Sequence, residues 1–244
     1  MKFTKRIFLI LIACAITTNI CAIQFRHLSI KDGLSQLSVL SIYQDKLGRM
    51  WFGTEEGINV FDGNNLTAIK TLRNIPPQNL EVRWICGDEK GNIYFQLGTS
   101  IVCIDFATQS NTVLVKKGVT TLCHHSGKIY YASRGSVYIY NIAKQSTHCM
   151  GQLTKDNIKV LHIDSRGTLW FGTHNGLFYF NKKTRRTTLS IKGAYVEYIY
   201  EDTKGNIWVS SRDKGCYRIS PKGSCTHYYI DDDTAKEENY NAVL

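Results

Sequence analysis

The feature that most constrains the fold is a short β-type unit that recurs along the chain. Residues 39–63 read VLSIYQDKLGRMWFGTEEGINVFDG, and residues 160–181 read VLHIDSRGTLWFGTHNGLFYFN. Each stretch contains three short runs of strand-forming residues separated by turn residues, which is the pattern of a small antiparallel meander. Because a meander of this size cannot bury its own faces, it needs copies of itself on either side.

A turn glycine marks each copy. It stands at Gly48, Gly91, Gly127, Gly167 and Gly205, so that successive copies are 43, 36, 40 and 38 residues apart. The third residue after this glycine is aromatic in every copy: Trp51, Tyr94, Tyr130, Trp170 and Trp208. The third residue before it is Asp45, Asp88, Asp164 or Asp202, with His124 in the third copy. A β-type unit with a period near 40 predicts a propeller blade, and a large ring at one fixed place fits the wedge between neighbouring blades.

We therefore predict an all-β fold, a β-propeller of about five four-stranded blades in an incomplete ring. The blades are expected near residues 38–72, 80–115, 119–153, 158–191 and 195–230, and a sixth begins near residue 241, where the sequence is expected to be truncated. Residues 23–244 would then be the N-terminal part of a propeller domain. The run Gln24–Leu28 is interpreted as an outer strand that pairs with the last blade and closes the ring.

The first 22 residues have the pattern of a secretory signal. Three basic residues precede an apolar run from Ile7 to Ile16, which is followed by polar residues and then Cys21 and Ala22. A lipoprotein signal with its cysteine at Cys14 is the alternative. The apolar run is shorter than the roughly 20 residues that a bilayer span needs, so we expect cleavage and a periplasmic location for the mature part.

The formal charge of +10 falls to about +7 without the signal. The remaining Lys and Arg residues are scattered through turns, and no run of them resembles a nucleic-acid site, so nucleic acid is not an expected partner of this stretch. A solvated surface is the preferred interpretation, with attraction to an anionic glycan as the alternative. Of the cysteines outside the signal, most are expected to be small core residues, and Cys216 and Cys225 are the pair most worth testing for a disulfide.

Motifs with catalytic chemistry are not evident in the sequence. The recurring aspartates could act as acid/base groups or calcium ligands, but one per blade in the same turn favours a structural role. His124 and His125 could bind a metal, although adjacent residues face different ways and a third ligand at a suitable spacing is missing. We identify no nucleophile elbow and no phosphate-binding loop. We therefore predict no catalytic residue, metal or cofactor in residues 1–244.

Residues outside the repeat pattern are the candidates for ligand binding. In a propeller, the loops from second to third strands and the loops entering each first strand open on one face. The entry loops carry Tyr195 and Glu197. They also carry Arg83 and Trp84, which are among the ligand-binding residues predicted below. The predicted ligand-binding residues are Glu55, Glu56, Arg83, Trp84, Arg134, His174, Asn175, Arg212 and Asp213. Such polar and aromatic side chains suit a carbohydrate, but they are also ordinary loop composition. The tryptophans of the repeat could stack on sugars, but their fixed place favours packing between blades.

The repeat V-x-x-I-x-x-D-x-x-G-x-[ILM]-W-F-G-T-x-x-G resembles the two-component regulator propeller repeat. The match is close in the first, fourth and fifth copies and partial in the second and third, where Tyr replaces Trp and the G-T is lost. The entry FRHLSIKDGLSQLSV is similar to the start of propellers in that family. The resemblance implies the periplasmic sensor of a hybrid histidine kinase, with a membrane span, kinase and regulator domains beyond residue 244 and a homodimeric full-length protein.

Sensors of that family commonly detect oligosaccharides and control polysaccharide-use genes, so the resemblance implies an oligosaccharide or another small periplasmic ligand as partner. A secreted protein-interaction scaffold is one alternative, and a propeller lyase or hydrolase is another. The first alternative predicts a stop codon where the sensor predicts a membrane span, and the second predicts turnover where the sensor predicts binding alone.

Overall fold

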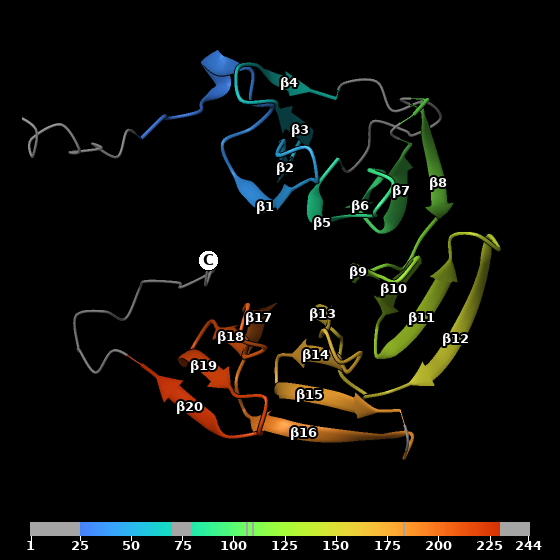
Figure 1. The fold of residues 1–244 in the computed structure, drawn as a ribbon, viewed down its shortest axis with the longest axis vertical. Helices are drawn as coiled ribbons and strands as arrows, with labels where there is room; N and C mark the ends of the chain where they lie inside the picture. Colours follow the sequence, from blue (N-terminus) through green and yellow to red (C-terminus); the bar gives the residue numbers. More distant parts are fainter. Residues whose placement is uncertain (1–24, 70–79, 106, 109, 183, 230–244) are drawn as a thin grey trace, which may run out of the picture.

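A computed structural model describes residues 25–69, 80–105, 107–108, 110–182 and 184–229. These residues form five four-stranded antiparallel sheets, each a meander in sequence order. A single 3-10 turn, η2 (Ile30–Asp32), is the helical element of the described part. The sheets are arranged as blades around a common axis (Figure 1). The prediction of an all-β propeller with four-stranded blades is confirmed.

The strands of the blades run outward from the axis in sequence order (Figure 1). Blade 1 contains β1 (Val39–Gln44), β2 (Met50–Thr54), β3 (Gly57–Phe61) and β4 (Leu66–Ala68). Blade 2 contains β5 (Val82–Gly87), β6 (Ile93–Leu97), β7 (Ser100–Ile104) and β8 (Asn111–Val115). Blade 3 contains β9 (Thr121–His125), β10 (Lys128–Ser133), β11 (Ser136–Asn141) and β12 (Ser146–Gln152). Blade 4 contains β13 (Val160–Ile163), β14 (Leu169–Thr173), β15 (Gly176–Asn181) and β16 (Arg186–Lys192), and blade 5 contains β17 (Val196–Glu201), β18 (Ile207–Ser211), β19 (Gly215–Ile219) and β20 (Cys225–Tyr228).

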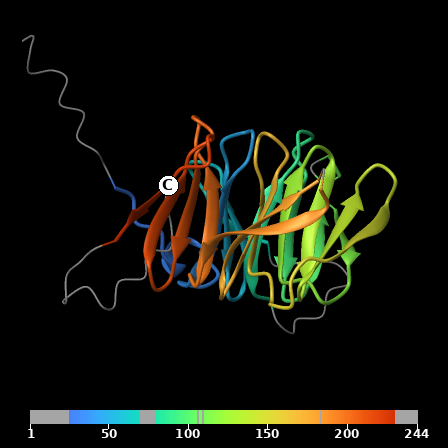
Figure 2. The ribbon, with the colours of Figure 1, turned by 90° about the horizontal axis from the view of Figure 1, so that it is seen from below.

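A meander places its turns alternately at the two ends of its strands, so the molecule has two faces that are formed by turns and connections (Figure 2). Face I carries the turns between first and second strands and between third and fourth strands. Face II carries the turns between second and third strands and the connections that enter each first strand. The first strands contact one another in the order β1, β5, β9, β13 and β17.

The hydrophobic core lies between adjacent blades. Side chains alternate across a strand, so each sheet points one set of residues at the preceding blade and the other set at the following blade. Trp51 and Ile58 of blade 1, for example, form one buried cluster with Ile93 and Phe95 of blade 2. Both faces of each inner sheet are therefore apolar, which explains the nearly continuous hydrophobic runs of the second strands.

The glycine of the W-F-G-T segment permits the close approach of neighbouring blades. A Cβ atom on Gly53 would lie 2.4 Å from the carbonyl oxygen of Val82, and one on Gly172 would lie 2.4 Å from Cγ1 of Val196. Both valines belong to the first strand of the next blade. The motif therefore encodes an inter-blade contact as well as a strand.

Some sequence predictions are wrong or fall outside the described residues. Phe25–Leu28 forms no strand, because Arg26 instead lies over the Phe61 ring at 5.1 Å and donates to the carbonyl oxygen of Gly63 at 3.4 Å. The secretory signal at residues 1–22, Gln24 and the sixth blade near residue 241 lie outside the described part. Within the described part, no helix is long and apolar enough to cross a membrane.

The disulfide hypothesis for Cys216 and Cys225 is also wrong, since both cysteines are free. In the β19–β20 pairing, Cys216 lies opposite Tyr228, and Cys225 lies opposite Ile219, so the two thiols are not cross-strand neighbours. Burial raises the pKa of both Cys103 and Cys123 to about 12. Those two cysteines are partly buried and pack against the core clusters. Cys149 and Cys225 are exposed, so the prediction of core cysteines is wrong for these two.

Candidate functional site

The first-to-second turn of face I is held by the recurring aspartate. In blade 1, Oδ1 of Asp45 accepts hydrogen bonds from the backbone N–H groups of Leu47 and Arg49, at 2.9 and 3.0 Å. Its Oδ2 accepts a hydrogen bond from Nε1 of Trp51 at 2.9 Å. The same carboxylate-to-ring bond recurs from Tyr94 to Asp88 (2.9 Å), from Trp170 to Asp164 (3.0 Å) and from Trp208 to Asp202 (2.9 Å).

These aspartates are built into the scaffold as carboxylates. Burial raises the pKa of Asp45, Asp88 and Asp164, but the hydrogen bonds outweigh burial and hold each pKa below its ordinary value. A carboxylate that is ionised and has both oxygens occupied is a poor general acid. The geometry is that of a structural turn, and it links the two repeated residues that the sequence presents separately.

Blade 3 dispenses with the aspartate because its turn is shorter. His125 pairs directly with Lys128, so only Ser126 and Gly127 form the turn, with φ of 49° and 69°. A two-residue turn with both φ values positive matches the twist of the strands and needs no side-chain cap. His124 is then free to stack on Tyr94 of blade 2, with ring centroids 6.3 Å apart.

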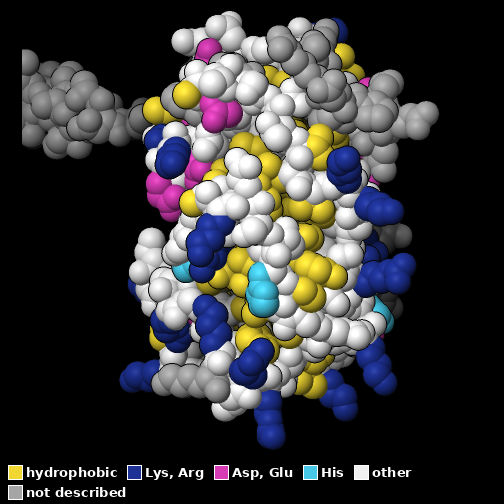
Figure 3. Space-filling model, turned by 90° about the vertical axis from the view of Figure 1, so that its right-hand side faces the viewer, with side chains coloured by type: hydrophobic (Ala, Val, Ile, Leu, Met, Phe, Trp, Pro, Cys, Tyr) yellow, Lys and Arg dark blue, Asp and Glu magenta, His cyan; other side chains and the backbone are white. Residues whose placement is uncertain are grey.

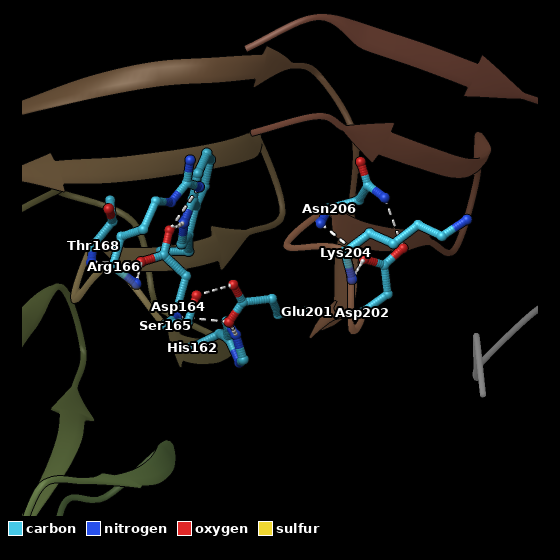
Figure 4. A network of polar contacts seen from close by, with 10 residues as sticks. His162, Asp164, Ser165, Arg166, Thr168, Glu201, Asp202, Lys204 and Asn206 are labelled. Carbon is cyan, nitrogen blue, oxygen red and sulfur yellow. Dashed lines mark hydrogen bonds and ion pairs between the residues drawn. The ribbon is translucent and has the colours of Figure 1, made fainter. Parts of the chain in front are cut away.

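A polar network on face I joins blades 4 and 5 (Figure 4). The Glu201 carboxylate accepts hydrogen bonds from the backbone N–H of Ser165 at 2.7 Å and from its hydroxyl at 2.6 Å. Nε2 of His162 lies 4.0 Å from the same carboxylate, and burial lowers the pKa of this histidine. The serine hydroxyl therefore donates to a carboxylate and not to the histidine, which is not the arrangement of a nucleophilic triad. The network instead connects blade 4 to blade 5.

The same residues offer no metal site. Across the described ranges, no three His, Cys, Asp or Glu side chains gather in a way that could hold an ion. Nε2 of His124 lies 3.9 Å from a carboxylate oxygen of Glu89.

Face II carries most of the predicted ligand-binding residues at the tips of short hairpins. In blades 1 and 4, the threonine of the G-T pair organises the tip. The Thr173 hydroxyl donates to the carbonyl oxygen of Gly176 at 3.3 Å and accepts from the backbone N–H of Asn175 at 3.0 Å. Thr54 makes the corresponding bonds around Glu56. The tip side chains therefore project from a turn that the backbone and threonine fix.

The structure does not bring all nine predicted residues together. Glu55 accepts a hydrogen bond from Nε2 of Gln36 at 3.0 Å, while Glu56 and Arg134 remain exposed at separate hairpin tips. Arg83 forms an ion pair with Glu81 at 2.5 Å. Trp84 lies on β5, not in a loop, and stacks with Tyr198 of β17 at a centroid distance of 6.2 Å. These residues therefore do not share one site.

Blades 4 and 5 carry four of the predicted residues on face II, in two contact groups that the backbone hydrogen bond from Gly193 to Asn175 links into one set. We call it the face II patch, and it consists of Asp156, His174, Asn175, Tyr195, Glu197, Arg212 and Asp213. On its blade 4 side, Nδ2 of Asn175 donates to Asp156 at 3.0 Å, and Nε2 of His174 lies 3.9 Å from the same carboxylate. The Asn175 carbonyl accepts from Gly193 N–H at 2.7 Å, which ties the hairpin tip to the connection entering blade 5.

On the blade 5 side, Arg212 is the central group of the patch. Its Nε lies 3.1 Å from Oε1 of Glu197, and its guanidinium lies over the ring of Tyr195, 5.0 Å from the centroid. Asp213 accepts hydrogen bonds from the backbone N–H of Tyr195 at 3.0 Å and from the Ser211 hydroxyl at 2.6 Å. Burial raises the pKa of Asp213, but those bonds outweigh burial and leave it below its ordinary value.

The patch is partly open to solvent. The Arg212 and His174 side chains are 59% and 48% exposed, whereas the carboxylates of Glu197 and Asp156 are 29% and 28% exposed. Exposed donors are thus backed by more buried acceptors, an arrangement that suits recognition of a polar ligand. Asp156 was not among the residues predicted from the sequence. Its only signal in the sequence is its position just before the predicted first strand of blade 4.

Comparison with known proteins places this site in context. The family model of the two-component regulator propeller matches residues 33–56 and 152–175. A stretch of 58 residues is 43% identical to Histidine kinase P4 of Formosa agariphila, covering 24% of this chain and 4% of that protein.

Solved structures share the fold. The extracellular domain of a hybrid two-component system, BT3049 of B. thetaiotaomicron, is similar with a TM-score of 0.56 and 20% identity, over 88% of this chain and 38% of that one. The extracellular domain of a second such system, BT4673, gives a TM-score of 0.67 at 16% identity, over 80% of this chain and 28% of that one. Virginiamycin B lyase from Staphylococcus aureus gives 0.64 at 14% identity, over 82% and 72%. The chain thus spans less than two thirds of the curated relative and of the two-component domains.

Proposed function

Because this chain carries two-component regulator propeller repeats, we propose that it is the ligand-sensing propeller of a hybrid two-component system. It binds an oligosaccharide on face II and controls the transcription of polysaccharide-use genes through kinase and regulator domains elsewhere in the protein. Residues 1–22 direct export, so the propeller works in the periplasm. Signalling then requires a second copy, and ligand changes the association or geometry of a homodimer.

The observation that carries the binding proposal is the face II patch. Sugar hydroxyl groups need acceptors and donors at fixed positions beside an aromatic or apolar surface. Asp156 and Glu197 supply acceptors, and Arg212 and Asn175 supply donors. The Tyr195 ring, together with the Arg212 guanidinium that lies over it, supplies the flat surface. The remaining predicted residues lie in separate contacts and do not form an equivalent arrangement.

Hydrogen bonds between loops hold the backbone around the patch. Hydrogen bonds from Gly193 to Asn175 and from Tyr195 to Asp213 fix the entry connection of blade 5 against both hairpin tips. A ligand therefore meets groups in place, and little binding energy is lost to ordering the loop.

The test is calorimetric titration of the purified protein with a panel of neutral oligosaccharides that differ in linkage and length. We expect heat of binding for one linkage class, without product formation on prolonged incubation. In the Arg212→Gln variant, affinity for that oligosaccharide should fall at least about tenfold, the loss typical of one charge-assisted hydrogen bond.

Arg134→Gln is the matched control, because Arg134 is an exposed arginine at a face II hairpin tip outside the patch. Its affinity should equal that of the wild type. Equal losses in both variants would move the site away from the patch. Turnover of the oligosaccharide would replace the sensor with an enzyme, and absence of binding across the panel would remove the oligosaccharide from the proposal.

A further inference from the structure

Charge is segregated between blades in a way that the overall composition conceals. Residues 106–155 contain no Asp or Glu, and residues 165–196 contain none either. These ranges cover almost all of blades 3 and 4, in which Asp156 and Asp164 are the acidic residues that remain. Seen from the side, basic side chains gather over the lower part of the molecule, whereas the visible acidic side chains lie in the upper part (Figure 3).

The third-to-fourth turns of face I show that this segregation is independent of the fold. Each turn needs a side-chain oxygen to accept a backbone N–H. Blades 1 and 2 use carboxylates, since Asp62 accepts from Asn64 at 2.8 Å and Asp105 accepts from Thr108 at 2.8 Å.

In blades 3 and 4, a neutral asparagine side chain accepts the corresponding hydrogen bond. Asn141 accepts from the backbone N–H of Lys144 at 2.9 Å, and Asn181 accepts from that of Thr184 at 3.1 Å. Because Asp and Asn cap such turns equally well, the turn geometry does not require the missing negative charge. The difference between the blades therefore resides in the electrostatic surface.

These two turns present a group of cations. The set consists of Lys144, Lys182, Arg185 and Arg186, all exposed, with the half-buried Lys128 beside them at the start of β10. No ion pair joins any of the five to an acid of the described residues. Lys182 lies across the first-to-second turn of its own blade, where its Nζ would be 3.5 Å from a Cβ on Gly167. We call this set the face I cationic surface.

The nearest acids on face I are already engaged. Asp164 accepts from Trp170 and Arg166, and Glu201 accepts twice from Ser165. Neither carboxylate forms an ion pair with a cation of this surface. Like charges that share one face repel one another and lower the stability of the folded protein, and an anionic ligand would relieve that repulsion.

We propose that the face I cationic surface binds a linear anionic polysaccharide, one that carries carboxylate or sulfate groups along its length. The surface lies at the strand ends opposite to the face II patch, so it is a second site and does not depend on the oligosaccharide proposed above. Exposed Thr184 and Ser146 in the same turns add hydroxyl groups of the kind that hydrogen-bond to sugars.

An anionic bilayer fits this surface less well. Membrane-surface binding combines basic residues with apolar side chains that enter the interface. In the described residues of blades 3 and 4, Leu189 is the one large hydrophobic side chain that is exposed, and it lies within β16 and not in either turn. The surface is therefore polar throughout, as a hydrated polyanion requires.

The experiment measures binding of the purified protein to fluorescent dextran sulfate and to unmodified dextran, which has the same backbone without charge. We expect binding of dextran sulfate alone, weakening as ionic strength rises. The triple variant Lys144→Gln, Lys182→Gln, Arg186→Gln should bind about tenfold more weakly, since exposed ionic contacts each contribute modestly.

A second pair of variants changes charge while keeping the turns. Asn141→Asp with Asn181→Asp retains both turn caps and should weaken binding about threefold at low ionic strength. Asp62→Asn with Asp105→Asn makes the opposite change on blades 1 and 2 and should alter affinity by less than about twofold. Circular dichroism should show all variants folded.

Three results would overturn the proposal. The first is unchanged affinity in the triple variant, and the second is equal weakening in the two Asn/Asp pairs. The third is tighter binding, through the same residues, of a DNA duplex or of vesicles containing anionic lipid. Loss of oligosaccharide binding on face II has no bearing on these outcomes, because the variants leave the face II patch intact.

Discussion

At the residue scale, the hydrogen bond from a ring to a carboxylate is the device that makes one blade resemble the next. The ring must pack between blades, yet its N–H or O–H needs a partner when buried. An aspartate six residues earlier supplies that partner and also caps the turn between them, as Asp164 does for Trp170. Recurrence of Asp and Trp could be read from the sequence, but their bond could not, because it depends on the turn bringing them together.

Removal of the ring N–H should lower the free energy of unfolding more where its hydrogen bond to the aspartate is buried. In Trp170→Phe, Asp164 loses one of its donors in a site without solvent, so the free energy of unfolding should fall by about 1–3 kcal/mol. In Trp208→Phe the loss should be smaller, since Trp208 and Asp202 are half-buried and water can replace the bond. Urea titration of both variants checks this, and equal losses would contradict it.

Acid should destabilise the propeller through the same aspartates. The pKa values of Asp45, Asp88 and Asp164 lie below the ordinary value of 3.8 in the folded protein. Their stabilising contribution is therefore complete above that value and is lost as pH falls through the folded pKa values. We expect the urea midpoint to be steady above about pH 5 and to fall below about pH 4. The Asp45→Asn variant should show a shallower fall, and a steeper one would contradict the assignment.

At the element scale, the second strand decides how closely blades approach. The second residue after the Trp or Tyr of the repeat is Gly53, Gln96, Ala132, Gly172 or Ser210. The repeat predicts the strand, but it does not predict which copies need glycine, because that depends on side chains of the adjacent first strand. The same holds for the hairpin tips. The repeat predicts where they fall in the sequence, but it does not predict which residues they contact.

A methyl group at the tight position should force the blades apart. In Gly172→Ala, the new Cβ would meet Cγ1 of Val196 at 2.4 Å and Cγ1 of Val160 at 2.7 Å. Overpacking of this kind costs about 1–3 kcal/mol. The reverse change, Ala132→Gly in blade 3, should cost about 0.5–1 kcal/mol through backbone entropy. Thermal unfolding of both variants provides the comparison, and a neutral Gly172→Ala would refute the close-contact account.

At the scale of the whole molecule, contacts across the axis supplement those between adjacent blades. Trp84 of blade 2 packs against the buried clusters of both the blade 2–3 and blade 4–5 interfaces. It also stacks with Tyr198, at an interplanar angle of 6°. Trp84 was predicted as a ligand-binding residue because it falls near a loop in sequence. Its stacking on Tyr198 follows from the arrangement of distant blades, which no local pattern encodes.

Removal of the Trp84 indole should lower the free energy of unfolding of the whole propeller. Trp84→Ala removes contacts with two clusters at once, and because Trp84 is half-buried we expect a loss of about 2–4 kcal/mol. Trp84→Phe, which keeps an aromatic surface, should recover about half of that loss. Urea unfolding followed by circular dichroism measures both. A Trp84→Ala variant as stable as the wild type would show that the cross-axis contact is incidental.

Fold and site differ in how far sequence could predict them. The propeller, its four-stranded blades and its turn residues follow from periodicity alone. Four of nine predicted binding residues meet in the face II patch, and Asp156 was missed, because convergence of loops from different blades depends on their relative positions. The charge segregation of blades 3 and 4 was visible in the sequence only once blades were assigned.

Hydrogen–deuterium exchange can locate the ligand contact that we propose on face II of blades 4 and 5. Exchange would be measured with and without the oligosaccharide identified by titration. We predict slowed exchange in the backbone around Asn175, Gly193 to Tyr195 and Arg212 to Lys214, with first-to-second turns such as that of Asp164 unchanged. Protection confined to the turns of face I, or spread evenly over all blades, would contradict the account.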